Sequence, residues 1–579
     1  MPTLNWIGKD KVVNHHLDVP FRVLEEQYTY GDNADGNMII HGDNLDALKA
    51  LLPRFEGRVK CIYIDPPYNT GNEGWVYNDN VNDPKIRKWL GEVVGKEGED
   101  LSRHDKWLCM MYPRLRLLQK LLAEDGCLAI SIGYQEINNL MIICKEIFGA
   151  RQIMATTVKT SGGKPSGSFN VTHEYIVFIL PEGFKANSSS LSVNEDSSPY
   201  HSMTLASFYQ EQRPNQVYPI YVDKDGLIVS CGKSLQEMID KGEYTGDKKS
   251  YIYDYEHAPE DTTAVWPVSN KGLPCVWRQI AESTMKDWEK GFIRVIPQKS
   301  KKTKNKWVIQ FLSDGIKKKI TAGEFKCRPT SEKCPTLEIM DYQTSGVTIP
   351  TMWDHKDFYT TRGTDQIENL LGKKTAFNYA KPVDLVKEII VRVSDKDSIV
   401  LDSFAGSGTT AHAVLNMNKQ DGGHRRFILV ETENYAEDIT AERVRRVITG
   451  YGEGKKAVEG TGGGFSFYEL GAPLMIDGNL NPGVPEARIR EYVYYTETKL
   501  PMPPVSEAEP HLLGVHNRAA YYFYYLPDAV TTLNEAFLRT IKTDADSYMI
   551  YADINALDEA TMKRHHITFK KIPRDITLL

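Results

Sequence analysis

The chain has 579 residues, enough for roughly three or four domains, and its 41% apolar and 25% charged residues exclude a wholly disordered chain. No apolar run approaches the roughly 20 residues that cross a bilayer and no secretory signal opens the chain, so we expect a cytoplasmic protein with no membrane contact. The eight cysteines form no Cys-x-x-Cys pair, which predicts reduced thiols, and the net charge of −7 does not by itself suggest a nucleic-acid partner.

Residues 1–182 alternate between apolar strands and amphipathic helices. The expected strands lie at 38–41, 59–64, 127–132 and 174–180, and the expected helices begin at Leu45 and at Trp107. Gly126 is expected to break the second helix. This alternation predicts a largely parallel sheet that is covered by helices on both faces.

Three further regions follow. Residues 183–345 are rich in Ser, Lys and Tyr, with short strand-like pieces and no sustained helical period. Residues 346–450 return to the alternation, with strands at 398–401 and 427–430 and a helix from Thr410. Residues 451–579 form an α/β-like tail, in which the aromatic run 521–525 predicts a strand packed on both faces.

The first chemical motif is Asp65-Pro66-Pro67-Tyr68, at the carboxyl end of an expected strand. Ligands bind at the carboxyl ends of strands in open α/β sheets. Neither proline has an N–H group, so the turn presents mainly hydrogen-bond acceptors, which suit a substrate with an amino group. Asp65 and the Pro66 carbonyl can hold the two hydrogens of a base amino group while Tyr68 stacks on the ring. The alternative is a plain turn that ends a strand.

The second motif runs from Leu401 to Thr410 and contains Phe404-Ala405-Gly406-Ser407-Gly408. It follows a strand and opens a helix, so its glycines let a ligand approach the backbone at a positive helix end. Glu431 ends the next strand, where an acid holds ribose hydroxyls in nucleoside-binding sheets. The motif lacks the third glycine of a dinucleotide fingerprint, so we predict a nucleoside cofactor; the alternative is a turn for close packing.

The charge is unevenly distributed. Residues 286–328 hold thirteen Lys and Arg against four Asp and Glu, a local net charge of +9. Such asymmetry indicates a phosphate partner as readily as a solvated lysine-rich loop. Two other kinds of site are not indicated, because there is no phosphate-binding loop of the Gly-x-x-x-x-Gly-Lys-Ser/Thr type and no convincing metal site.

The two motifs together resemble those of the beta-class amino-methyltransferases of restriction–modification systems, and the Asp-Pro-Pro-Tyr form resembles the adenine-N6 members. The N-terminal stretch and the tail, with Ile567-Thr568-Phe569-Lys570-Lys571-Ile572-Pro573, are similar to modification subunits of Type III systems. The resemblance implies S-adenosylmethionine as methyl donor, adenine in duplex DNA as acceptor and no metal. It also implies a Rossmann-like methyltransferase fold with a mostly parallel seven-stranded sheet, an inserted target-recognition domain and a C-terminal α/β domain.

The implied domains are a catalytic half at 1–182, a target-recognition domain at 183–345, a cofactor-binding half at 346–450 and a C-terminal domain at 451–579. The implied catalytic residues are Asp65, Pro66, Pro67 and Tyr68. The implied cofactor-binding residues are Asp43, Phe377, Lys381, Asp402, Phe404, Gly406, Ser407, Gly408, Thr409 and Glu431. Phe377 and Lys381 match a motif that closes over the methionine end of the cofactor, although Asp43 and Lys381 fit a helix cap and a solvated lysine equally well.

We expect DNA phosphates to contact basic residues of the insert, namely Lys299, Lys301, Lys302, Lys304, Lys306, Arg213 and Arg278. Arg278 fits a buried structural arginine equally well. A target base inside a duplex is inaccessible, so the reaction requires base flipping.

Alternatives to adenine-N6 methylation stay open. They are N4-cytosine methylation, a non-catalytic role as the DNA-recognition subunit of a restriction complex, methylation of RNA, and methylation of protein. The resemblance also implies a homodimer and a separate helicase–nuclease (Res-type) partner in a phage-defence system.

Overall fold

The computed structural model describes residues 3–32, 34, 36–70, 100–162, 170–187, 199–269, 271–298, 300, 302–339, 349–372, 377, 380–452, 454 and 457–574. The chain forms two compact units, one from Met1–Leu191 with Gly346–Leu579 and one from Ser192–Ser345.

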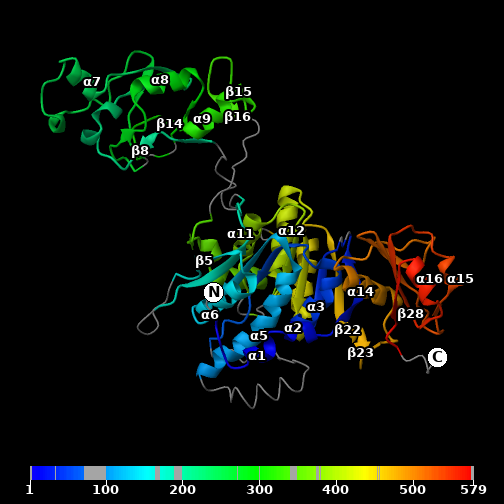
Figure 1. Cartoon of the computed structure of the whole chain (residues 1–579). Helices are drawn as coiled ribbons and strands as arrows, with labels where there is room; N and C mark the ends of the chain where they lie inside the picture. Colours follow the sequence, from blue (N-terminus) through cyan, green and yellow to red (C-terminus); the bar gives the residue numbers. More distant parts are fainter. Residues whose placement is uncertain are drawn as a thin grey trace. The chain divides into compact units, whose positions relative to one another are not determined.

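The larger unit is built on a ten-stranded sheet (Figure 1). The strands, in spatial order, are β1 (Arg22–Gly31), β22 (Gly464–Pro473), β2 (Met38–His41), β19 (Arg426–Glu431), β18 (Ile399–Asp402), β3 (Val59–Ile64), β4 (Leu122–Ile132), β6 (His173–Leu180), β5 (Gln152–Lys159) and β17 (Met352–Trp353). The strands from β22 to β4 run parallel, β6 is antiparallel to both of its neighbours, and β1 is antiparallel to β22. The mostly parallel α/β sheet is thus confirmed, with ten strands where seven were expected.

Helices cover both faces of this sheet, because alternate residues of each strand face opposite layers. On β3, Ile62 and Ile64 pack with α3, α5 and α6, whereas Cys61 and Tyr63 pack with α11, α12 and α13. The helices of the larger unit are α1 (Lys9–Val12), α2 (His15–Asp18), α3 (Asn44–Phe55), α5 (Asp100–Leu121), α6 (Ile137–Phe148), α10 (Thr360–Leu371), α11 (Val383–Val393), α12 (Thr409–Asp421), α13 (Glu442–Thr449), α14 (Glu486–Thr498), α15 (Glu535–Leu538) and α16 (Glu559–Arg564).

The second expected helix has different boundaries in the structure, where α5 begins at Asp100. Gly126 does not break a helix, because α5 ends at Leu121 and β4 runs through Gly126. The glycine is needed for close approach, since a Cβ atom there would lie 2.8 Å from the Val59 carbonyl oxygen of β3.

The tail contributes to two sheets. Its first long strand, β22, pairs with β2 inside the main sheet, so the expected boundary at 450 falls before a strand of that sheet. A second sheet follows, in the order β25 (Leu512–His516), β26 (Ala519–Phe523), β28 (Ser547–Ala552) and β30 (Ile567–Lys571). Tyr522 and Phe523 of β26 are buried in different clusters, on opposite faces of that strand, as the aromatic run predicted. Short pairs complete the tail: β20 (Gly450–Tyr451) with β21 (Val458–Glu459), β23 (Met475–Ile476) with β24 (Asn479–Leu480), and β27 (Thr532–Leu533) with β29 (Ile554–Asn555).

The described residues of the smaller unit form short strands and three short helices. Its strands are β7 (Tyr200–Ser202), β8 (Thr204–Leu205), β9 (Ile220–Asp223), β10 (Ile228–Cys231), β11 (Thr262–Val265), β12 (Val276–Trp277), β13 (Ile293–Pro297), β14 (Trp307–Leu312), β15 (Cys327–Pro329) and β16 (Leu337–Ile339). Its helices are α7 (Leu235–Asp240), α8 (Ala281–Glu289) and α9 (Asp314–Thr321). Trp277, Tyr218 and Ile293 lie in its core.

We predict that Gly363→Ala destabilises the larger unit. Alanine normally stabilises a helix interior by about 1 kcal/mol over glycine. Gly363 of α10, however, packs so closely on the chain before α11 that a Cβ atom would lie 1.8 Å from the Ala380 carbonyl oxygen. Because the added methyl group would overpack this contact, we expect Gly363→Ala to lower the free energy of unfolding by about 1–3 kcal/mol. Denaturant titration measures this change.

Gly315→Ala in α9 is the matched control, since a Cβ atom there meets nothing within 4 Å. It should be neutral or stabilising by up to about 1 kcal/mol. Equal effects of the two substitutions would contradict the packing argument.

Candidate functional site

The two sequence motifs emerge on the same edge of the main sheet. Strands β3 and β18 are parallel neighbours, with Cys61 beside Val400 and Ile62 beside Leu401. Because parallel strands end on the same side, Asp65 after β3 and the glycine turn after β18 lie next to each other.

The turn after β3 is held by α5. The Trp107 indole, fully buried, donates a hydrogen bond of 2.8 Å to the Pro67 carbonyl oxygen. Asn69 closes the turn with a positive φ of 60° and is itself buried. The Pro67 carbonyl is therefore engaged in fixing the turn, which leaves Asp65, the Pro66 carbonyl and Tyr68 as the groups for a ligand.

Lys381 reaches the catalytic motif from the chain just before α11. Its Nζ lies 3.0 Å from Asp65 Oδ1, 2.8 Å from Tyr68 Oη and 3.3 Å from Glu174 Oε2. It also lies 4.7 Å from the centroid of the Tyr68 ring. The ammonium thus contacts Asp65 of the first motif, and Lys381 is not a solvated lysine because its side chain is only 11% exposed.

Burial raises the pKa of the Asp65 carboxyl above its ordinary value; the Lys381 ammonium opposes this rise and the Glu174 carboxylate adds to it. Burial alone would lower the pKa of Lys381, but the two carboxylates raise it above its ordinary value. Lys381 is therefore charged at neutral pH, and Asp65 is a stronger proton acceptor than an exposed aspartate.

The glycine turn after β18 has the backbone conformation that its residues predict. Gly406 and Gly408 have φ values of 53° and 80°, which favour glycine. A Cβ atom on Gly406 would lie 3.1 Å from the Phe377 ring, so the turn and this aromatic side chain are in close approach.

Two carboxylates support the turn. Glu431, at the end of β19, accepts a hydrogen bond of 2.7 Å from the Gly406 N–H and another of 3.0 Å from the Glu433 N–H. Asp402 accepts from the Phe404 N–H at 3.1 Å and from the Thr410 hydroxyl at 2.5 Å. Burial raises the pKa of both Asp402 and Glu431 to about 7.

Arg443 of α13 anchors the start of α12. It is fully buried and donates hydrogen bonds to the hydroxyls of Ser407 (2.7 Å) and Thr409 (2.8 Å). Thr409 in turn donates to the Lys381 carbonyl at 3.2 Å. These two hydroxyls therefore connect the glycine turn to the segment that carries Lys381.

Asp43 caps a helix. Its carboxylate accepts from the backbone N–H groups of Leu45 and Asp46 at the start of α3, and it pairs with Arg114 at 3.5 Å. It still lies at the sheet edge of the site, because the adjacent Gly42 N–H donates to the Glu431 carbonyl at 2.9 Å.

A pocket brings together eight of the fourteen predicted catalytic and cofactor-binding residues. It is lined by Tyr63, Asp65, Phe377, Ala380, Lys381, Asp402, Phe404, Ala405, Gly406, Ser407, Thr409 and Thr410. Residues from the first and third regions of the chain therefore line one pocket within the larger unit.

Sequence reasoning missed Glu174 and Trp107. Glu174 is 6% exposed and stands at the start of the apolar strand β6, where a charged residue is unusual. A charged residue in an apolar strand is the sequence feature that could have indicated Glu174. No sequence feature indicates the role of Trp107, because an indole in an amphipathic helix is normally a core residue.

Four of the predicted DNA contacts of the smaller unit are exposed, and a fifth, Arg213, is half-buried. Lys302, Lys304 and Lys306 are exposed in the connection between β13 and β14, and Lys304 pairs with Glu256 at 2.6 Å. Arg278 is exposed, which excludes the buried alternative, and it donates to the Ser202 carbonyl. The two remaining lysines, Lys299 and Lys301, lie outside the described residues.

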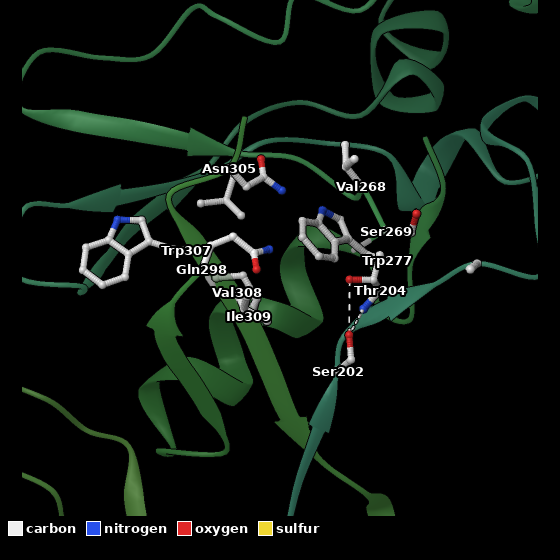
Figure 2. A pocket seen from close by; sticks show the side chains of 12 residues that line it. Ser202, Thr204, Val268, Ser269, Trp277, Gln298, Asn305, Trp307, Val308 and Ile309 are labelled. Atoms are coloured by element: carbon white, nitrogen blue, oxygen red, sulfur yellow. Dashed lines mark hydrogen bonds between the residues drawn. The ribbon is translucent and has the colours of Figure 1, made fainter. Parts of the chain in front are cut away.

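Next to Arg278 the smaller unit has a pocket with polar and aromatic walls (Figure 2). Ser202, Thr204, Gln298 and Trp307 are among the residues that line it. Arg213 stacks on the Phe208 ring, with its guanidinium carbon 3.7 Å from the ring centroid.

Within the described residues, no helix is long and apolar enough to cross a membrane, and no group of three or more His, Cys, Asp or Glu side chains could hold a metal ion.

Comparison with known proteins assigns the family. Residues 59–442 match the family model of N6 and N4 DNA methylases (N6_N4_Mtase, DNA methylase), so the chain belongs to this family.

Among its relatives, the chain is similar to the Mod subunit of the Type III restriction-modification enzyme EcoPI from Escherichia phage P1, with 30% identity over 74% of this chain and 63% of the relative. The Mod subunit of the Type III enzyme EcoP15I from Escherichia coli is 29% identical over 75% of this chain and 65% of the relative. The Type II methyltransferase M.KpnI from Klebsiella pneumoniae is 27% identical over 69% of this chain and 82% of the relative. The chain thus spans less than two thirds of the length of these two Mod subunits.

We predict that Asp402 makes stability fall as pH rises. The unfolded carboxyl loses its proton near its ordinary pKa of 3.8, whereas the folded one keeps it to about 7. Between these values the folded state binds more protons, so the free energy of unfolding decreases with increasing pH. Asp402→Asn should remove up to about 1.4 kcal/mol per pH unit of that slope.

Denaturant titrations across this pH range measure the slope. Asp397→Asn, at an exposed position before β18, is the control and should leave it unchanged. An Asp402→Asn variant with the wild-type slope would contradict the raised pKa.

Proposed function

We propose that this chain transfers a methyl group from S-adenosylmethionine to the N6 amino group of a flipped adenine in duplex DNA, within a restriction–modification or related defence system. The observation that carries the proposal is the shared pocket, in which the acceptor turn after β3 faces the glycine turn after β18. Family membership and the relatives' names support the same reaction.

The residues after β18 and β19 fit the cofactor. Gly406 and Gly408 carry no side chain and have positive φ values, so a ligand can approach the backbone of this turn closely. The Glu431 carboxylate ends its strand beside this turn, where it can accept hydrogen bonds from ribose hydroxyls. Phe377 supplies an aromatic wall, and Asp402 with Phe404 fixes the strand end.

When bound, S-adenosylmethionine supplies a methyl carbon made electrophilic by the adjacent sulfonium charge. Asp65 and the Pro66 carbonyl would accept the two hydrogens of the target amino group, which would leave its lone pair free for methylation. The Asp65 carboxylate would stabilise the positive charge that develops on this nitrogen during the transfer, and the cofactor would leave as a neutral thioether. The amino nitrogen then loses one proton to Asp65, whose raised pKa suits this acceptor.

Tyr68 completes the base site. Its ring stands next to Asp65, and its hydroxyl donates to Glu174 at 2.8 Å, which fixes the ring plane. A planar base that leaves the duplex can stack on this ring. Catalysis in this arrangement is mostly positioning, which needs neither a metal nor a covalent intermediate with the protein.

The smaller unit is the proposed target-recognition domain. Lys302, Lys304, Lys306, Arg213 and Arg278 would bind phosphates or base edges. We further propose a cytoplasmic homodimer that works with a separate helicase–nuclease (Res-type) subunit, because two of the relatives are Mod subunits of Type III enzymes.

We predict that Asp65→Ala abolishes methyl transfer, by at least about 100-fold, because the amino group loses its charged acceptor. Transfer of labelled methyl groups from S-adenosylmethionine to duplex DNA measures the rate. DNA affinity should stay within a few-fold, and Asp397→Ala should behave as wild type. Near-normal transfer by Asp65→Ala would overturn the catalytic assignment.

We also predict that the triple substitution of Lys302, Lys304 and Lys306 by Gln flattens the salt dependence of DNA binding. Each lost phosphate contact should reduce the slope of log K against log salt by about 1. Titrations at several salt concentrations measure this slope. Substitution of Lys224, Lys248 and Lys249, exposed in the same unit, is the charge-matched control. An equal loss of slope in both variants would place the DNA path elsewhere.

A further inference from the structure

Glu174 contacts the catalytic motif although it belongs to neither sequence motif. It opens β6, two strands away from β3, and its side chain is only 8% exposed. Its Oε2 atom accepts from the Tyr68 hydroxyl at 2.8 Å and from the Lys381 ammonium at 3.3 Å. Its Oε1 atom is buried and has no hydrogen-bond partner among the described residues. A buried carboxylate with a spare acceptor atom requires an explanation.

The Lys381 ammonium competes with the proposed substrate. An ammonium and a base amino group are both N–H donors, and Lys381 already lies 3.0 Å from Asp65 Oδ1. A carboxylate can accept from several donors, so the target amino group and Lys381 would share Asp65, and the second donor would weaken the contact between Lys381 and Asp65. Moving a buried ammonium away from its carboxylate is strongly unfavourable unless a second acceptor receives it.

Glu174 is placed to be that second acceptor. Its Oε2 atom is already within 3.3 Å of Lys381, and the neighbouring Oε1 atom is unpartnered. The Tyr68 hydroxyl, which accepts from Lys381 and donates to Glu174, keeps the two groups together. Two carboxylates share one ammonium here, so one carboxylate can lose it without leaving the cation alone.

We propose that Glu174 is a positioning residue for methyl transfer, which receives the Lys381 ammonium when the target amino group takes its place at Asp65 and which holds the Tyr68 ring for stacking. The inference rests on the proposed function. It assigns Glu174 no contact with the reacting atoms.

The test compares single-turnover methyl transfer by wild type and by Glu174→Gln, which keeps the shape of the side chain and removes its charge. The expected result is a rate at least about 10-fold lower, as for a misplaced reactive group. Affinity for S-adenosylmethionine should stay within two-fold. Glu182→Gln, at an exposed position after the same strand, is the control and should match wild type.

The pH profile separates this role from a merely structural one. The charged and titratable groups around Glu174 are Asp65, Tyr63, Tyr68 and Lys381. The negative charge of Glu174 helps to raise the pKa of Asp65, after the larger effect of burial. The acid limb of the rate profile should therefore move to lower pH in Glu174→Gln.

A double substitution tests the exchange of the ammonium directly. The Lys381→Met variant has no ammonium that Glu174 could receive. Adding Glu174→Gln to this variant should therefore lower the methyl-transfer rate by less than about 3-fold further. The effects of the two substitutions would then be non-additive. Thermal unfolding checks that each variant is folded. The fluorescence of 2-aminopurine at the target position reports base stacking without turnover, and Glu174→Gln should bind the flipped base more weakly.

Glu174→Gln with the wild-type rate and pH profile would overturn the inference, as would fully additive losses with Lys381→Met. Wild-type protein that transfers no methyl group to DNA would overturn the proposed function itself, and this result is recognised before any variant is compared.

Discussion

The buried ammonium of Lys381 is the interaction on which the site depends. It lies among Asp65, Tyr68 and Glu174, which come from the ends of β3 and β6, while Lys381 itself precedes α11. Lys381 and Tyr68 are 313 positions apart in the sequence. Two buried carboxylates near each other would repel and favour protonation, so the cation is required to keep them charged in this space. The acceptor turn is therefore complete only when both halves of the sheet have assembled.

The parallel sheet provides the second requirement, which is proximity. Strands β3 and β18 are hydrogen-bonded neighbours, so an acceptor turn and a glycine turn meet although a separate unit interrupts the chain between them. Arg443 and Thr409 then tie the glycine turn to the segment of Lys381. One network of buried polar groups thus connects the proposed cofactor side with the proposed base side.

Much of the fold and of the candidate site was predictable from the sequence, because the residues of each motif lie in one short continuous segment. The strands at 59–64 and 427–430 and the two turns that follow β3 and β18 stand out by apolar runs that end in Pro or Gly. Other features arise only from pairing across the fold. The strand β22 joins the main sheet from the tail, Glu174 acts from an antiparallel strand, and Lys381 contacts Asp65. Neither periodicity nor spacing carries information about such long-range contacts.

Asp65 as the acceptor of the adenine amino group is the role on which the proposed reaction depends. Single-molecule sequencing of DNA from cells that express the chain alone, beside cells that express Asp65→Ala, measures this role. We expect N6-methyladenine in one short sequence motif with wild type and none with the variant. N4-methylcytosine in place of N6-methyladenine would contradict the assigned base, and N6-methyladenine made equally by the variant would contradict the role of Asp65.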